Sequence, residues 1–223
     1  MTVDPGQVLT DARNAFRRGS HADALEKYLW CYHNSLEHSL AFYGVRLSYV
    51  VFELLALGKV YPPAREALES IQSSNLQSLR DGSHNPSEFH DFASINERLG
   101  RHQLTGELFA SLAESDPEFA RRCFPFARVA VISTGNFALA RRFVTSPTEE
   151  LDASLVRVAK MINADSTHDE TFIGIYAKHI RQLSSIFEGV GENEKATLLQ
   201  MKATEALTDP CVREELRRQL LWR

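Results

Sequence analysis

The sequence lacks the motifs by which many enzymes and metalloproteins are recognised. It has no glycine-rich phosphate-binding loop, no GxSxG motif and no acidic metal-binding cluster. Cysteine is scarce: the three residues Cys31, Cys123 and Cys211 form no CxxC pair and have no histidine at zinc-finger spacing. We expect three reduced thiols, at least two of them packed in helix faces, no metal and no cofactor. A catalytic site assembled from residues distant in sequence stays open.

Charge of one sign and long hydrophobic runs are also lacking. The net charge is −4, with 24% charged and 43% hydrophobic residues, as in an ordinary folded domain. This balance favours neither nucleic acid nor an anionic membrane as a partner. The most apolar run, residues 49–57, is interrupted by Glu53 and is shorter than the roughly 20 residues of a membrane span. With no signal peptide at residues 1–7, these features predict a soluble, cytoplasmic protein.

What the sequence does have is helical periodicity. Leu25, Tyr28, Leu29, Tyr32 and Leu36 recur at the spacing of one buried helix stripe, and no stretch alternates long enough to require a strand. Capping residues before proline, and glycine after periodic segments, give the expected ends. The predicted helices span residues 6–18, 22–38, 43–57, 62–79, 86–99, 102–114, 117–134, 137–144, 147–163, 169–188, 192–207 and 210–222.

A repeated turn pattern follows several glycines. Gly19, Gly58, Gly100 and Gly135 each follow a periodic segment, where a left-handed C-cap is expected. A small residue comes about five positions later and a bulky residue about nine positions later, as close packing of two helices requires. The segment GSHADALEKY, residues 19–28, resembles the second half of a tetratricopeptide repeat, and the whole chain resembles a divergent member of that superfamily.

The resemblance implies an all-α fold in which antiparallel helix hairpins stack as a tetratricopeptide-like α-solenoid of roughly 10–12 helices. Residues 1–145 would form the repeat region, and residues 146–223 would stack on it or cap it, giving one continuous structural unit. In such arrays the first helix of each pair lines a concave, partner-binding surface. The resemblance therefore points to Arg13, Arg17, His90, Ser94 and Glu97 as partner-binding residues.

Aromatic residues suggest a second part of that surface. Trp30, His33 and Glu37 share one helix face, and Tyr43 lies in the next predicted helix. Tyrosine and tryptophan suit surfaces that are dry on one side and wet on the other, although packing of one aromatic face against each neighbouring helix is the favoured explanation. His33 and His38 are five residues apart, so they cannot hold one metal ion from a continuous helix.

One pair of arginines differs from the other three in the sequence. Arg121 and Arg122 lie early in a predicted helix, whereas the other pairs lie near helix C-termini, where cations complement the helix dipole. Guanidinium groups at this position would suit a carboxylate on a partner, although pairing with Asp116 or Glu118 is the alternative. We include both arginines among the candidate site residues.

The leading hypothesis is a non-catalytic scaffold that binds a protein or peptide, as a monomer or homodimer. An enzyme is one alternative, and it requires His33, Glu37 and His90, or a similar set, to converge in a closed pocket. A structural oligomerisation module is the other. The stripe of Val212, Leu216 and Leu220 in the last helix would then join two copies rather than dock on its own chain.

Overall fold

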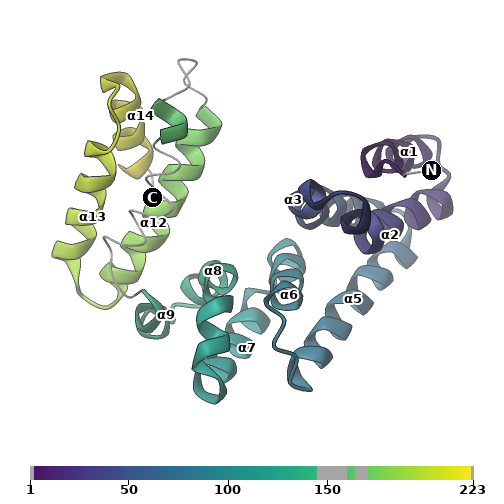
Figure 1. Ribbon diagram of the computed structural model, residues 1–223, viewed down its shortest axis with the longest axis horizontal. Helices are drawn as coiled ribbons and strands as arrows, with labels where there is room; N and C mark the ends of the chain where they lie inside the picture. The colour runs from purple at the N-terminus through teal and green to yellow at the C-terminus, as the bar shows by residue number, and fades with distance from the viewer. Residues whose placement is uncertain (1–2, 145–159, 164–169, 222–223) are drawn as a thin grey trace. The chain divides into compact units, whose positions relative to one another are not determined.

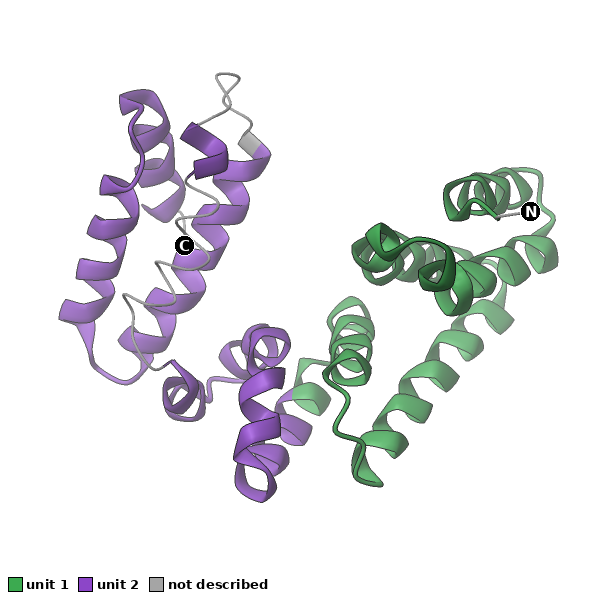
Figure 2. Cartoon of the chain, in the orientation of Figure 1, with its two compact units in different colours: residues 1–105 green, residues 106–223 purple. Residues whose placement is uncertain are grey.

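The computed structural model describes residues 3–144, 160–163 and 170–221. The described residues fold into helices joined by short connections, and no strand occurs among them (Figure 1). The all-α class is therefore confirmed. The chain forms two compact units, Met1–Thr105 (unit 1) and Gly106–Arg223 (unit 2), and each has buried apolar residues of its own (Figure 2).

The α-helices begin and end within two residues of the predicted positions wherever the chain is described. The helix predicted over 43–57 differs, because a 3-10 turn that begins at Leu40 precedes it and a π-helical turn at Arg46–Val50 interrupts it. The predicted helix over 147–163 lies almost wholly outside the described residues, and the predicted boundary at residue 145 stays a prediction. Unit 1 contains α1 (Pro5–Arg17), α2 (His21–His38), η1 (Leu40–Phe42), α3 (Tyr43–Val45), η2 (Arg46–Val50), α4 (Val51–Gly58), α5 (Pro62–Arg80), α6 (Pro86–Leu99) and the start of α7 (His102–Ser115). Unit 2 contains the rest of α7, α8 (Pro117–Ser133), α9 (Phe137–Phe143), α12 (Glu170–Gly189), α13 (Asn193–Glu205) and α14 (Pro210–Leu221).

Capping side chains explain where several helices begin. The side chains of Asn85, Asp116 and Asp209 each accept a hydrogen bond from a backbone N–H two or three residues later, at 2.7–3.0 Å. Each is followed by a proline at the first helical position, where the missing N–H costs nothing. Ser146, another capping residue that precedes a proline in the sequence, lies outside the described residues.

The predicted left-handed glycines are confirmed at three positions. Gly19, Gly100 and Gly135 have φ of 77°, 69° and 73°. The prediction is wrong for Gly58, which is the last residue of α4 and has no positive φ. Its small size serves a different purpose, because a Cβ there would lie 3.0 Å from the Cβ of Arg65. Gly58 therefore allows the end of α4 to approach α5 closely.

The residues that follow these three glycines pack as their spacing predicts. The small residues five positions later are buried: Ala24, Thr105 and Ala140. The bulky residues nine positions later are fully buried: Tyr28, Phe109 and Val144. Each of these turns thus places one small residue and then one bulky residue in the buried face of the next helix or at its C-cap. The stacking of hairpins into a solenoid stays a prediction.

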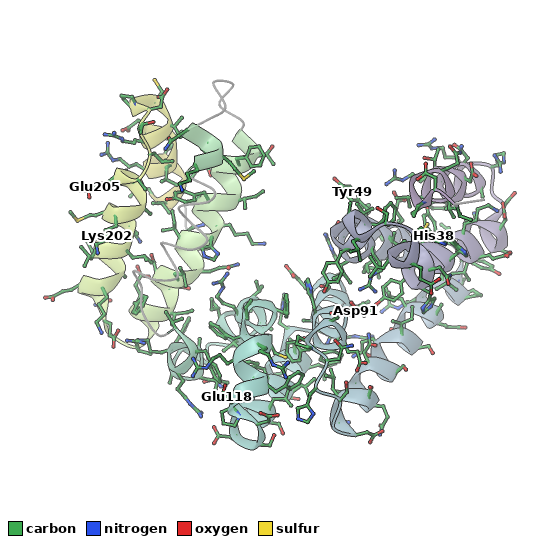
Figure 3. All side chains as sticks on the ribbon, in the orientation of Figure 1. His38, Tyr49, Asp91, Glu118, Lys202 and Glu205 are labelled. Carbon is green, nitrogen blue, oxygen red and sulfur yellow. The ribbon has the colours of Figure 1, made fainter. Side chains whose placement is uncertain are left out.

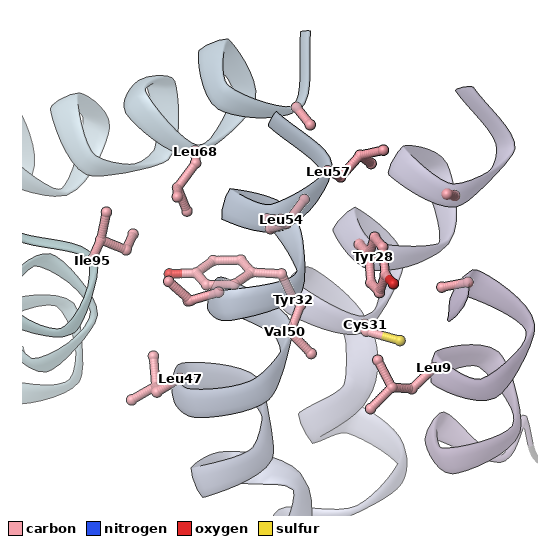
Figure 4. Close-up of a cluster of buried hydrophobic side chains, with 14 of the residues drawn as sticks. Leu9, Tyr28, Cys31, Tyr32, Leu47, Val50, Leu54, Leu57, Leu68 and Ile95 are labelled. Atoms are coloured by element: carbon pink, nitrogen blue, oxygen red, sulfur yellow. The ribbon is translucent and has the colours of Figure 1, made fainter. Parts of the chain in front are cut away.

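The core of unit 1 gathers around α2 (Figure 4). Tyr28 and Tyr32, one turn apart on this helix, are 0% and 4% exposed and pack with apolar residues of α1, η2, α4 and α5. Their hydroxyl groups point to opposite sides of the cluster (Figure 4). Cys31, the residue before Tyr32, is also buried, and burial raises the pKa of its thiol to about 11. This core thus places a phenol hydroxyl at each of two edges.

The apolar helical segment of unit 1 spans residues 40–58 and is longer than the apolar run at residues 49–57. Its 19 residues are long and apolar enough to cross a membrane by length and composition alone, and 33% of the stretch is buried. Its buried apolar residues belong to the core of unit 1. Apolar helices of this length also occur in the cores of soluble proteins. Arg46 begins a π-helical turn inside this segment, where a single α-helix is predicted. Such turns widen the helix locally and often occur at functional sites.

Unit 2 has its own aromatic core. Phe109, Phe124 and Phe143, from α7, α8 and α9, have ring centroids 5.0–5.8 Å apart. In α14, Val212 and Leu216 are at most 1% exposed, and this helix packs on α12 and α13. The last helix therefore docks on its own chain with most of its predicted apolar stripe.

Candidate functional site

A buried ion pair lies where η2 and α6 meet in unit 1. Arg46 at the start of η2 donates two hydrogen bonds to Asp91 of α6, from Nη1 to Oδ2 at 2.7 Å and from Nη2 to Oδ1 at 2.6 Å. The two side chains are only 7% and 14% exposed. Burial works to lower the pKa of Arg46, but the hydrogen bonds and charge of Asp91 outweigh it and raise that pKa. Arg46 therefore stays charged, and its two parallel hydrogen bonds fix the geometry of the pair.

Two tyrosines hold this pair. The Tyr32 hydroxyl donates to Oδ2 of Asp91 at 2.9 Å, and the guanidinium carbon of Arg46 lies 4.8 Å from the centroid of the Tyr32 ring. The ring of Tyr43 is 5.6 Å from the same carbon. Burial, and then the charge of Asp91, raises the pKa of the Tyr32 phenol. Hydrogen bonds and cation–π contacts thus fix Arg46 without filling all of its donors.

The Tyr43 hydroxyl also meets His90, the residue before Asp91. The Tyr43 oxygen lies 2.9 Å from Nδ1 of His90. Burial is the largest cause that lowers the pKa of His90, with the nearby Arg46 adding to it and Asp91 opposing it. His90 is therefore mainly neutral at neutral pH, so its Nδ1 can accept a hydrogen bond from the Tyr43 hydroxyl.

A cleft opens beside the ion pair, between α2 and α5. It has a volume of about 500 Å³. Its walls combine apolar side chains with hydroxyl, amide, imidazole and charged groups: Leu29, Tyr32, His33, Arg46, Ala67, Ser70, Ile71, Ser74, Asn75 and Asp91. His33, Ser70 and Ser74 are exposed, whereas Arg46 is 6% exposed. The cleft therefore has a polar, accessible rim over a buried charged floor.

His33 is the predicted residue that the structure places in this cleft. Burial and the positive charge of Arg46 lower its pKa, and the charge of Asp91 partly opposes this shift. The cleft thus presents mainly a neutral imidazole at neutral pH, which can donate one hydrogen bond and accept another. The predicted residues Tyr43 and His90 lie directly behind it, against the same ion pair.

The predicted arginines of α1 belong to a second polar network. Arg13 donates to Glu53 of α4 at 2.8 Å, and the Tyr28 hydroxyl donates to the same carboxylate at 3.2 Å. Burial is the largest cause that raises the Tyr28 pKa, whereas the charges of Arg13 and Arg17 lower it. Arg17 is exposed and donates to Asn14 at 3.2 Å. These arginines therefore stabilise the edge of the core and do not line the cleft described above.

The remaining predicted residues are spread over both units. Trp30 packs partly against the core and stacks on His38 of the same helix, with ring centroids 5.4 Å apart. Ser94 is half-buried, and the exposed Glu97 acts on His90 through its charge. Arg121 and Arg122 are exposed on α8 of unit 2, where Arg122 lies 5.3 Å over the Phe119 ring.

The two residues at the centre of the site are absent from the set predicted by sequence. Arg46 is the one charged residue between positions 40 and 52, and this is the signal that could have singled it out. A guanidinium in an apolar helix must find a carboxylate partner. Asp91 carries no comparable signal, because it is 45 residues away in a helix with other acids. The buried side chain of Asn96 in α6 accepts a hydrogen bond from Gln72 at 3.2 Å and donates one to Thr105 at 3.1 Å.

The geometry of the cleft suits binding more directly than proton transfer. Asp91 accepts hydrogen bonds from both Arg46 and Tyr32, so its oxygens are occupied rather than poised to take a proton. No group of three or more His, Cys, Asp or Glu side chains able to hold a metal ion occurs within residues 3–144, 160–163 and 170–221. What the cleft offers a ligand is a fixed set of donors and acceptors.

Comparisons with known proteins return no match among family models, curated proteins or solved structures. Function must therefore be inferred from the residues of the cleft and their geometry.

Proposed function

We propose that this chain is a non-catalytic scaffold that binds a peptide segment of a partner protein in the cleft between α2 and α5. The observation that carries the proposal is the cleft of about 500 Å³ with an exposed polar rim and a rigid Arg46–Asp91 floor. Rigid sites lose little freedom on binding, which favours affinity.

The groups along the cleft match the needs of a peptide backbone. His33, Ser70 and Ser74 can donate and accept hydrogen bonds, while Leu29 and Ile71 provide apolar contact for side chains. Nε of Arg46 is buried and has no hydrogen-bond partner. A carbonyl oxygen of a bound peptide that reached this donor would satisfy it.

The scaffold is preferred to an enzyme because the cleft does not bring the candidate catalytic residues together. The enzyme alternative needs His33, Glu37 and His90, or a similar set, together, yet of these three residues the lining of this cleft includes only His33. Nδ1 of His90 is already engaged by Tyr43. Binding requires none of these groups to change its protonation state.

Selection of displayed random peptides on the full-length protein tests the proposal. Ser70→Trp fills the cleft, whereas Ser73→Trp places the same bulk at an exposed position of α5 outside the lining. We expect selected peptides to bind the wild type and Ser73→Trp alike, and Ser70→Trp about tenfold or more weakly. Equal binding to all three proteins, or no peptide enriched on the wild type, would overturn the proposal.

A further inference from the structure

A second groove lies in unit 1 between α4, α5 and α6. It has a volume of about 440 Å³. Its floor is apolar and includes Phe52, Leu55 and Leu99. Phe52 is 55% exposed, whereas Leu55 and Leu99 pack with one side against the core of unit 1. It shares no lining residue with the cleft between α2 and α5.

The charged residues that line this second groove are all cations. Lys59 caps α4, Arg65 lies near the start of α5, and Arg98 lies in the last turn of α6. All three are exposed. Arg65 donates a hydrogen bond to Glu69 at 3.3 Å, but it shares this carboxylate with Arg101, which donates to the same oxygen at 2.7 Å. The groove therefore carries an excess of positive charge, although the whole chain has a net charge of −4.

The apolar surface continues beyond the groove along one helix face. Tyr49, one turn before Phe52, is 58% exposed and projects from the segment that α3, η2 and α4 form (Figure 3). Tyr49, Phe52 and Ala56 follow the i, i+3, i+7 spacing of a single face. This face lies opposite the residues that the segment buries, which include Val50 and Leu54. Such a stripe offers a partner helix about two turns of apolar contact.

We infer that this groove binds an amphipathic helix of a partner protein whose apolar face is flanked by Asp and Glu. The apolar residues of the partner would cover Tyr49 and Phe52 and enter the groove above Leu55 and Leu99. Its carboxylates would pair with Lys59, Arg65 and Arg98, which come from three separate elements and so fix the orientation of the helix. Phosphate head groups also suit cations, but a recess of this kind fits projecting side chains better than the flat surface of a bilayer.

Gly58 keeps the groove in shape. It lines the groove at the point where α4 ends, and a Cβ there would lie 3.1 Å from the backbone nitrogen of Arg65. The close approach of α4 to α5 therefore fixes the spacing between Lys59 and Arg65. A fixed spacing of cations selects among acidic partners by the positions of their carboxylates.

Selection from a displayed library of amphipathic helices, about four turns long and varied only in the charges beside a constant apolar face, tests the inference on the full-length protein. We expect enrichment of acidic helices. A selected peptide should bind the double variant Lys59→Glu/Arg98→Glu about tenfold or more weakly than the wild type. Arg80→Glu, a single charge reversal of the same kind at the other end of α5, should bind as the wild type does. Phe52→Ser should weaken the same peptide, and circular dichroism checks that each variant is folded.

Four results would overturn the inference. These are no enrichment, enrichment of basic helices, equal binding of the selected peptide by the double variant, and binding to phosphatidylserine vesicles that the double variant loses while acidic helices fail to bind. Ser70 does not line this groove, so the Ser70→Trp variant should bind the acidic helix as tightly as the wild type does. The two binding sites can therefore fail or succeed separately.

Discussion

Asp91 accepts two hydrogen bonds from Arg46 and one from Tyr32, in a place where the arginine has almost no contact with water. Replacing Asp91 with Ala leaves a buried cation without its partner. We expect Asp91→Ala to lower the free energy of unfolding by about 3–5 kcal/mol, measured by urea denaturation. The exposed Glu66→Ala on α5 is the control and should change it by less than about 0.5 kcal/mol.

The double variant Arg46→Met/Asp91→Leu separates the charge from the space it occupies. Removal of both charges should restore most of the free energy of unfolding that Asp91→Ala loses, because apolar residues of similar volume need no ion-pair partner. If Asp91→Ala cost less than about 1 kcal/mol, the Arg46 side chain would have an alternative partner and the floor of the cleft would not be rigid.

His179 predicts a pH dependence in unit 2. Burial, together with the positive charge of Arg128, lowers the pKa of His179 from 6.5 to about 4, and Nη2 of Arg128 lies 2.9 Å from its Nδ1. The folded state therefore prefers the neutral ring. Its contribution is complete above the unfolded pKa of 6.5 and is lost as the pH falls towards about 4.

The expected size of this effect between about pH 7 and pH 4 is about 3 kcal/mol, at about 1.4 kcal/mol for each unit of pKa shift. His179→Gln keeps an acceptor for Arg128 but does not titrate. Between about pH 7 and pH 4, the wild type should therefore lose that much more unfolding free energy than the variant does. Parallel pH profiles for the two proteins would show that His179 does not have a lowered pKa.

At the scale of helices, two glycines of α12 make a matched pair. A Cβ at Gly189 would lie 2.1 Å from Cγ of Phe137, whereas a Cβ at Gly174 would meet only Oε1 of Gln219, at an ordinary 3.8 Å. We expect Gly189→Ala to destabilise the protein by about 1–3 kcal/mol because α9 must shift. Gly174→Ala should instead stabilise it by up to about 1 kcal/mol, since alanine is the better helix former.

Thermal and urea unfolding of these two variants gives the comparison directly. Opposite signs are expected from the same substitution in the same helix. A stabilising Gly189→Ala would mean that α9 and the end of α12 are not in close contact.

The helices themselves were predictable because their signals are local. Asn85, Asp116 and Asp209 cap helices that begin at the following proline, and the glycine turns at 19, 100 and 135 end others. Each signal involves residues within a few positions of one another. The role of Gly58 was not predictable in this way, because it depends on α5, which approaches it only in the folded chain. The π-helical turn at Arg46 likewise has no local sequence signal.

At the scale of the whole molecule, the class of fold was predictable and the site was only partly so. His33, Tyr43 and His90 were singled out, and the structure brings all three against the Arg46–Asp91 pair. The pair itself was missed because it joins residues 45 positions apart, which periodicity cannot reveal. The second groove was missed for a similar reason. Its three cations, Lys59, Arg65 and Arg98, come from three elements that meet only in the folded chain.

The division into two compact units also sets where ligands should act. Both proposed sites are lined only by residues of unit 1. A peptide bound in either one should therefore protect amides of that unit first.

Hydrogen exchange of the full-length protein, with and without a peptide selected for the cleft, is the sharpest test of binding between α2 and α5. We expect slower exchange in α2, in the middle of α5 and around Asp91 of α6, with α13 and α14 of unit 2 unchanged. The same peptide should give no protection in Ser70→Trp and full protection in Ser73→Trp. Protection confined to unit 2, or protection in unit 1 that survives Ser70→Trp, would contradict binding in the cleft.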